Sequence, residues 1–276
     1  MRVIVSHDVD HLTFSEHWRD LILPKFIARM GLEAACGSIQ FCEIGSRLLD
    51  MLHNKRQNLL ELLAYDQDHG IRPTFFIGMA RGLGLSYSVA AATDWVELLS
   101  ARACDLGIHG IAFADLEAMR QEQARFAAAL GHYRFGMRMH YLRRDSGTMD
   151  RLATLGYPFD TTIPGDGGPR RGPGGMWLFP LHMMDGWYLL GDRRYQIHSA
   201  REAFLETRHR IDQLEYCGVD YLTINFHDSY FSNSYLSWKE WYKRVIDDLI
   251  ARDSQFISYS QAIELLEVEG LGDLPR

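Results

Sequence analysis

Short apolar segments alternate with longer amphipathic ones along most of this sequence. The short segments have the length and composition of buried strands, and they cover residues 2–6, 73–77, 105–109, 136–140, 157–161, 176–181, 221–226 and 256–259. Strand–helix units repeated in this way form parallel strands joined by right-handed crossovers. We therefore predict an α/β fold, namely a distorted (β/α) barrel of about seven parallel strands.

Helix ends can be placed at several points. Apolar residues from Leu48 to Leu63 predict one long helix that ends near Gly70. Ser199 and Ser260 are the predicted N-caps of two later helices.

Two segments interrupt the alternation. Residues 31–46 contain three glycines, and residues 163–175 are rich in glycine and proline, so both are predicted to be loops. The second is long enough to form a surface loop over one rim of the barrel. Strand and helix patterns of the same kind continue on both sides of it. Residues 1–276 are therefore predicted to form a single domain.

Composition excludes several classes of protein. The 29 basic and 36 acidic residues give a net charge of -7, with no basic stripe, so a nucleic-acid partner is not expected. No apolar run approaches the roughly 20 residues of a membrane span, and no secretory signal is visible at the N-terminus. The four cysteines form no C-x-x-C pair and are interpreted as free thiols. A cytoplasmic protein without a membrane span is expected.

Chemically active side chains gather at the predicted strand ends. In β/α barrels, the loops after the C-terminal ends of the strands build the active site. Five predicted strands place polar residues there: His7, Asp8, Asp10, His11, His109, Arg138, His140, Asp160 and His227. Each of these residues alone would suit an ordinary structural role, such as a turn or a surface ion pair. Their occurrence at one rim predicts an active site.

Asp8 and Asp10 are two residues apart, so they project from the same side of a strand. Two carboxylates that close stay ionised only beside a cation, which is either a metal ion or Arg138. One carboxylate could then bind the metal together with His109 while the other acts as a general base. His227, on a distant strand, could act as the general acid.

These residues resemble the motifs of a known family. The segment 6–11, Ser-His-Asp-Val-Asp-His, is similar to the first motif of the polysaccharide deacetylase superfamily, also called the NodB-homology or carbohydrate esterase 4 group. It resembles the His-Asp-Val-Asp branch found among enzymes of O-antigen and surface-polysaccharide synthesis. Residues 107–110, 136–141, 157–162 and 222–227 are similar to the later motifs, in the same order. The resemblance implies a NodB-like barrel and removal of an N-acyl group, such as acetyl, from a sugar.

The resemblance also implies roles for single residues. Asp8 would be the base, and Arg138 would orient it. His227 would protonate the departing nitrogen, and Asp160 would orient His227.

The metal site that the resemblance implies is incomplete. Asp10 and His109 would be two ligands of a divalent ion, for which zinc is expected. The family's second histidine of this motif is replaced here by Phe113, which cannot bind a metal. Either another side chain supplies the third ligand or the metal is bound weakly or not at all. The candidates for a third ligand are His7, His11 and His140.

The expected substrate is a carbohydrate, either nucleotide-linked, lipid-linked or an oligosaccharide. Aromatic side chains near the rim are candidates for binding it, namely Tyr141, Trp187 and Tyr230, with Trp177 and Phe231 as further possibilities. Two alternatives remain open. The same fold could carry a small-molecule amidohydrolase similar to allantoinase, or the chain could be a catalytically silent binding or scaffold protein, which Phe113 would favour.

Overall fold

A curled sheet forms the centre of the computed structural model, which describes residues 1–17 and 21–270. Its strand order is β6-β7-β5-β4-β3-β2-β1-β9-β8, and β10 pairs with β1. All pairs are parallel except β6 with β7. The strands are β1 Arg2–Val9, β2 Thr74–Ile77, β3 Asp105–Gly110, β4 Met137–Met139, β5 Phe159–Asp160, β6 Arg170–Arg171, β7 Trp177–Leu178, β8 Met183–Met184, β9 Tyr221–Asn225 and β10 Gln255–Phe256. The predicted domain of residues 1–276 includes residues 18–20 and 271–276, which lie outside the described residues.

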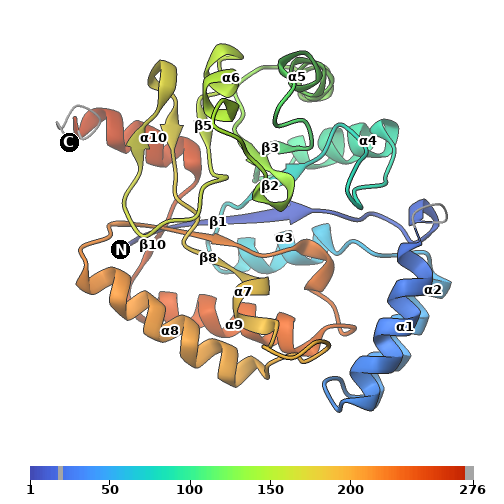
Figure 1. The fold of residues 1–276 in the computed structure, drawn as a ribbon. Coiled ribbons are helices and arrows are strands. Elements are labelled where there is room, and N and C mark those ends of the chain that lie inside the picture. Colours follow the sequence, from blue (N-terminus) through green and yellow to red (C-terminus); the bar gives the residue numbers. More distant parts are fainter. Residues whose placement is uncertain (18–20, 271–276) are drawn as a thin grey trace.

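Helices surround this sheet (Figure 1). They are α1 Ile22–Ala35, α2 Phe41–Leu52, α3 Leu59–Asp68, α4 Val89–Ser100, α5 Leu116–Leu130, α6 Thr148–Thr154, α7 Asp185–Leu189, α8 Ala200–Tyr216, α9 Leu236–Ala251 and α10 Tyr259–Val268. Figure 1 shows α8 and α9 side by side below the strands, α4, α5 and α6 above them, and α1 with α2 extending at one side. In the part of the chain described here, no helix is both long and apolar enough to span a membrane.

One stretch of chain joins the two sides of the curl. Within residues 177–184, β7 pairs with β5 and β8 pairs with β9, and Leu181 forms a bridge to Pro164 between them. The expectation of a distorted α/β barrel is therefore confirmed. The strand count differs, because β6 and β8 are only two residues long and show no alternating pattern in the sequence.

Alternation along β1 divides its side chains between two environments. Val3, Val5 and Val9 face the surrounding helices and join the larger apolar core. Ile4 belongs to a second core inside the curl, with Phe76, Phe159, Trp177 and Tyr259 among its members. Ser6 and Asp8 share the side of Ile4, so they also lie inside the curl.

Several local predictions need correction. Residues 31–46, predicted as a loop, lie mostly in α1 and α2, because Gly31 and Gly45 sit within helices supported by neighbouring apolar residues. Gly37 alone of the three glycines lies between the two helices, with φ of 68°. The single long helix up to Gly70 is two helices, α2 and α3, separated by residues 53–58. Ser199 caps α8 as predicted, whereas α10 is capped by Ser258 rather than Ser260.

Candidate functional site

A cavity of about 420 Å³ opens where β1, β3, β4 and β9 end. Its lining residues are Asp8, Asp10, His11, His109, His140, Tyr141, Leu142, Met184, Asp185, Gly186, Trp187, Leu190, His227, Ser229, Tyr230 and Trp238. The predicted polar residues of four separate strands therefore meet at one place. The two residues Tyr141 and Leu142 line its rim in the left-handed backbone region, with φ of 54° and 52°, a conformation that non-glycine residues adopt rarely and that is often found at functional sites.

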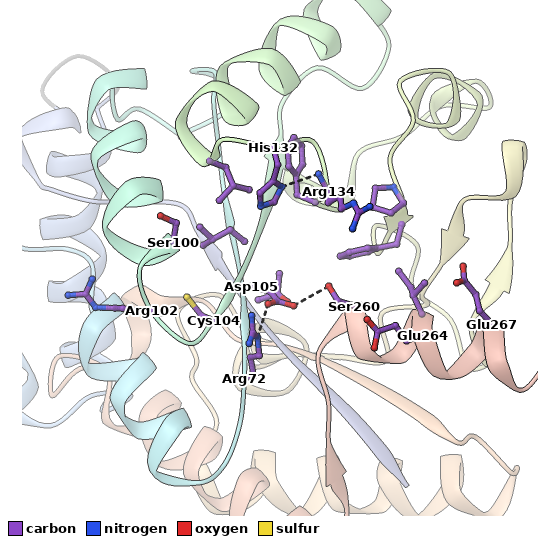
Figure 2. A pocket seen from close by; sticks show the side chains of 17 residues that line it. Arg72, Ser100, Arg102, Cys104, Asp105, His132, Arg134, Ser260, Glu264 and Glu267 are labelled. Atoms are coloured by element: carbon purple, nitrogen blue, oxygen red, sulfur yellow. Dashed lines mark hydrogen bonds and ion pairs between the residues drawn. The ribbon is translucent and has the colours of Figure 1, made fainter.

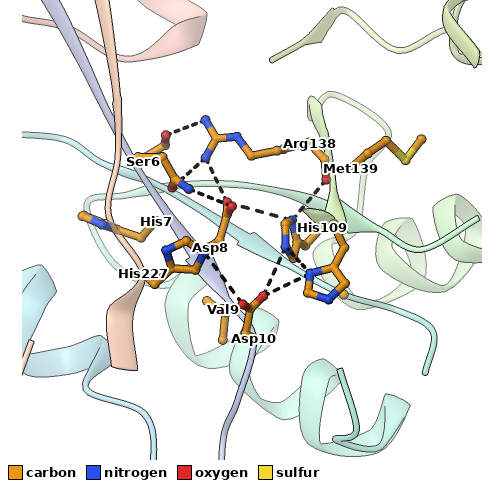
Figure 3. Close-up of polar contacts among 12 residues, drawn as sticks. Ser6, His7, Asp8, Val9, Asp10, His109, Arg138, Met139 and His227 are labelled. Carbon is orange, nitrogen blue, oxygen red and sulfur yellow. Dashed lines mark hydrogen bonds and ion pairs between the residues drawn. The ribbon is translucent and has the colours of Figure 1, made fainter. Parts of the chain in front are cut away.

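Asp8 is held by two neighbours. Arg138 Nη1 donates to its Oδ1 at 2.9 Å, and Asn225 Nδ2 donates to its Oδ2 at 2.8 Å. Arg138 is itself fixed, because it also donates to Asn225 Oδ1 and to Ser6 Oγ. Burial raises the pKa of Asp8, but the charges of Arg138 and His109 outweigh burial and lower the pKa below its ordinary value. Asp8 is therefore an ionised and rigidly oriented carboxylate (Figure 3).

Asp10, His109 and His140 form a cluster that could hold a metal ion. Asp10 Oδ1 lies 3.2 Å from His109 Nε2 and 3.3 Å from His140 Nδ1, and the two ring nitrogens are 2.9 Å apart. Figure 3 shows Asp10 and His109 turned toward each other. His140 thus lies beside the two ligands predicted from the sequence, and of the three candidates for the third ligand it is the one that joins this cluster.

Each of the two histidines of this cluster has one ring nitrogen near Asp10 and one far from it. The contacts of the far nitrogens indicate that the cluster fits a cation. His109 Nδ1 bonds to the Arg138 carbonyl at 3.2 Å, and His140 Nε2 bonds to the Leu83 carbonyl at 3.1 Å. A carbonyl only accepts, so each far nitrogen carries a hydrogen, and in the neutral rings the two near nitrogens present lone pairs to each other. Asp10 Oδ1 is buried and has no hydrogen-bond partner among the described residues. With both rings neutral, three electron-rich atoms face one point, which either a bound cation or a proton held between the two rings would stabilise.

His227 is positioned by an acid that the sequence analysis did not identify. Its Nδ1 donates to Asp185 Oδ1 at 2.9 Å, and its backbone N–H donates to Asp185 Oδ2 at 2.8 Å. The other ring nitrogen, Nε2, lies 3.7 Å from Asp10 Oδ2. Burial alone would lower the pKa of His227, but the Asp185 carboxylate outweighs it and raises the pKa to about 10. At neutral pH His227 therefore carries a proton beside the Asp10 cluster.

The predicted partnership of Asp160 with His227 is wrong. Phe159 of β5 packs inside the curl, so alternation turns Asp160 to the opposite side. Its carboxylate accepts from the backbone N–H and the hydroxyl of Thr162. The acid that contacts His227 is Asp185 instead.

The other candidate third ligands lie outside the cluster. His7 faces the helices, where its ring nitrogens bond to the Phe226 carbonyl and to Asp66 Oδ2. His11 lines the cavity, but its ring packs against His17 with centroids 4.7 Å apart. Burial lowers the pKa of His11 well below its ordinary value, so it is a neutral side chain at the cavity wall.

Phe113 is not part of the cavity lining in the described structure. Its ring lies under the Arg143 guanidinium, with 4.3 Å between the carbon centre and the ring centroid. The side chain at position 113, where the family's motif has a histidine, therefore contacts Arg143 and does not line the cavity.

The three aromatic residues predicted to bind the substrate, Tyr141, Trp187 and Tyr230, all line the cavity. Trp177 and Phe231 are buried core residues instead. The predicted loop at residues 163–175 contributes no residue to this cavity among those described, so it does not cover the site.

A second, larger cavity lies where β2, β3 and β5 begin, whereas the cluster lies where the strands end. Figure 2 shows the side chains that line this cavity. The cavity holds about 830 Å³. Arg72 and Ser260 both bond to Asp105 there. No group of three metal-ligating side chains is found in it within the described residues, so it is a weaker candidate for the reaction site.

Two positioning residues, Asp185 and Asn225, were missed. Asp185 follows Met183–Met184, just as Asp10 follows β1, but β8 is too short to be recognised as a strand. Asn225 alternates with His227 along the end of β9, which places both on the inner side. That spacing was a usable signal for Asn225.

The fold and the cluster define a class: a curled β/α barrel with carboxylate and imidazole groups at the C-terminal ends of its strands. No model of a known protein family matches the chain, and no curated protein matches its sequence. Solved structures do match. A protein from Mycobacterium smegmatis assigned to the polysaccharide deacetylases has a TM-score of 0.68 at 18% identity, over 100% of this chain and 93% of that one.

Two further structures are similar. A protein from Pseudomonas aeruginosa PAO1 with the same assignment has a TM-score of 0.62 at 12% identity, over 95% of this chain and 89% of that one. Puue allantoinase has a TM-score of 0.59 at 13% identity, over 77% of this chain and 73% of that one. The chain therefore has the polysaccharide deacetylase fold, and the resemblance predicted from its motifs is confirmed at the level of the fold.

Proposed function

We propose that this chain is a metal-dependent hydrolase that removes an N-acyl group from a carbohydrate. The observation that carries the proposal is that one cavity brings together an ionised carboxylate, a group of side chains that could hold a metal ion, and a protonated histidine. These are Asp8, the Asp10–His109–His140 group and His227. The likeness of the fold to proteins assigned as polysaccharide deacetylases supports the same reaction class.

Asp10, His109 and His140 would hold the metal ion, for which zinc suits a donor set of one carboxylate and two imidazoles. When bound, such an ion supplies polarisation of a carbonyl and a lower pKa for water. Phe113 does not argue against this site, because His140 provides the third donor.

The chain's own residues supply the proton transfers. Asp8 accepts the proton of the attacking water, since Arg138 and Asn225 leave it ionised and fixed in orientation. The new C–O bond gives a tetrahedral carbon, and its C–N bond then breaks. His227 donates its proton to the departing nitrogen, so the products are a carboxylic acid and an amine. Figure 3 shows Asp8, His109 and His227 around Asp10, in keeping with transfers at one centre.

The test measures acetate release from a panel of N-acetylated sugars by purified, zinc-loaded protein, with metal content determined by elemental analysis. We expect release from at least one sugar and its loss in the Asp8→Asn variant. Allantoin is included in the panel, since Puue allantoinase shares the fold. Turnover of allantoin alone would favour the amidohydrolase alternative, and absence of both metal and turnover would favour a binding or scaffold protein.

A cluster of three possible metal ligands that does not involve position 113 supports catalysis over the scaffold alternative. A role in O-antigen synthesis and a cytoplasmic location rest on the sequence and stay predictions.

A further inference from the structure

A small cavity of about 170 Å³ lies beside the candidate active site. It is bounded by α1, by α2 and the segment after it, and by the region from η4 (Asp228–Tyr230) to α9. Tyr230 and Trp238 line both cavities, and their rings stack with centroids 3.9 Å apart. A ligand in one cavity is thus separated from a ligand in the other by only two side chains.

The side chains that line this small cavity are mostly basic, whereas the chain as a whole carries a net negative charge. Four basic side chains line the cavity, namely Lys25, Arg29, Arg47 and Arg56. Of its described lining residues, Glu33 alone is acidic. Both Glu33 oxygens are already engaged, Oε1 by Arg29 Nε at 2.6 Å and Oε2 by Arg47 Nη1 at 2.6 Å. Three more positive than negative groups therefore gather on a protein whose net charge is -7.

Several donors at this cavity have nothing to donate to. Arg47 is 2% exposed and its Nη2 has no hydrogen-bond partner among the described residues. The same is true of Arg56 Nε, Arg56 Nη1 and Trp238 Nε1. A buried donor without an acceptor costs about 1–3 kcal/mol, so unpaired donors in one place point to an acceptor that arrives as a ligand.

Arg56 is the most informative of these groups. Its guanidinium carbon lies 5.3 Å and 5.0 Å from the ring centroids of Phe14 and Phe26. The aromatic faces fix its position, yet its Nε and Nη1 have no hydrogen-bond partner among the described residues. A planar guanidinium held in this way is well suited to bidentate bonding with the oxygens of a phosphate.

We propose that this cavity binds the phosphate or diphosphate of a glycosyl phosphate, while the acylated sugar of the same molecule occupies the cavity beside it. This inference rests on the proposed function and names its class of substrate. A neutral oligosaccharide could accept hydrogen bonds from Arg56 and Arg47, but it would leave the excess positive charge of the cavity uncompensated, whereas a phosphate supplies both acceptors and negative charge. The carrier attached to the phosphate is either a nucleoside or a polyisoprenyl lipid, since both present the same anion.

The first experiment tests the site without catalysis. Isothermal titration calorimetry with inorganic pyrophosphate uses the wild-type protein, Arg56→Gln, Lys25→Gln and the matched control Arg134→Gln, whose side chain lines the cavity at the other end of the strands. We expect saturable binding, at least tenfold weaker in Arg56→Gln, weaker also in Lys25→Gln and unchanged in Arg134→Gln. No saturable binding by the wild type, or equal binding by all four proteins, would overturn the anion site. Lys25 is exposed, so its variant remains informative if Arg56→Gln fails to fold.

The second experiment tests the substrate class. Acetate release is compared for an N-acetylated sugar as its methyl glycoside, its 1-phosphate, its nucleoside diphosphate, its polyisoprenyl diphosphate and a matching N-acetylated uronic acid. We expect a kcat/KM at least tenfold higher for the phosphorylated sugars, and a larger loss for them than for the methyl glycoside in Arg56→Gln. The better of the two carriers identifies the source of the phosphate. Equal kcat/KM for the neutral sugar, or preference for the uronic acid, would overturn the proposal. If pyrophosphate binds but no sugar is turned over, the anion site stands and the proposed function fails.

Discussion

Asp185 holds His227 through two hydrogen bonds, one to the imidazole Nδ1–H and one to the backbone N–H of the same residue. The two contacts fix both the ring orientation and the strand end that carries it. With Nδ1 donating to a carboxylate, the opposite nitrogen faces Asp10 and the cavity. The Asp185–His227 pair therefore presents a proton at a defined place, which is what the breaking of a C–N bond requires.

Replacing Asp185 by Asn should shift the pH dependence of the reaction. The carboxylate raises the pKa of His227 to about 10, so its removal lowers that pKa. A general acid loses activity as pH rises through its pKa, and the alkaline limb of the kcat profile should therefore move to lower pH. The measurement is acetate release from about pH 6 to about pH 11, a range that includes both the ordinary histidine pKa and the raised pKa of His227, about 10. Asp160→Asn is the matched control, and a similar shift in that variant would mean that Asp160 acts on His227 after all.

Asp8→Asn should remove activity without removing metal. A positioned base contributes about 10²- to 10⁴-fold to a rate, so a loss of that size in kcat is expected. Metal content should be unchanged, because Asp8 is not one of the three clustered ligands. Full activity in this variant would show that another group accepts the proton from water. Loss of metal together with activity would instead make Asp8 a ligand.

The sequence was sufficient for the fold and for the inward-facing residues of the longer strands. Asp8, His109, Arg138 and His227 follow from the alternation of buried strands and from the rule that strand ends meet at one rim. Asp185 could not be predicted in this way, because β8, the strand before it, has only two residues and is too short to show an alternation of apolar and polar residues. Asp160 was misplaced for a related reason, since the side on which a side chain lies depends on which residue of β5 packs inside.

The third metal ligand could not be predicted from the sequence for a different reason. His7, His11 and His140 are equally good donors in the sequence, and only their contacts separate them. Asp66 binds His7 on the helical side, whereas the Leu83 carbonyl orients His140 toward Asp10. Both partners are distant in the chain, so no local pattern indicates them. The charge of the small cavity beside the site likewise depends on tertiary packing, because it comes from Lys25 and Arg29 of α1, Arg47 of α2 and Arg56 of the segment after α2.

His140→Gln should weaken metal binding, whereas Phe113→His should not strengthen it. His140 contributes one of three donors, so its loss should raise the dissociation constant for zinc by about tenfold or more. The Phe113 ring packs under Arg143, away from the cluster, and a histidine there would not reach the ion. Competition with a coloured zinc chelator measures both variants. Tighter binding by Phe113→His would show that the third position is still open in the wild-type protein.

His7→Leu should reduce stability and leave the metal site intact. The His7 and Asp66 side chains are both fully buried, with 2.8 Å between Nε2 and Oδ2. Removing one partner leaves the Asp66 carboxylate with a hydrogen bond from the Tyr242 hydroxyl but without its histidine. Breaking a buried pair of this kind costs about 3–5 kcal/mol, so the free energy of unfolding should fall by roughly that amount.

Urea unfolding of the metal-free protein measures this change, and zinc content is then determined on the reloaded variant. His53→Leu, at an exposed position, is the control and should alter the free energy of unfolding by less than about 0.5 kcal/mol. Because His7 projects from the helical side of β1 while Asp8 and Asp10 project from the other, its loss should not change the zinc stoichiometry. A variant that stays stable but loses zinc would place His7 among the ligands and would contradict the division of β1 into a structural and a chemical side.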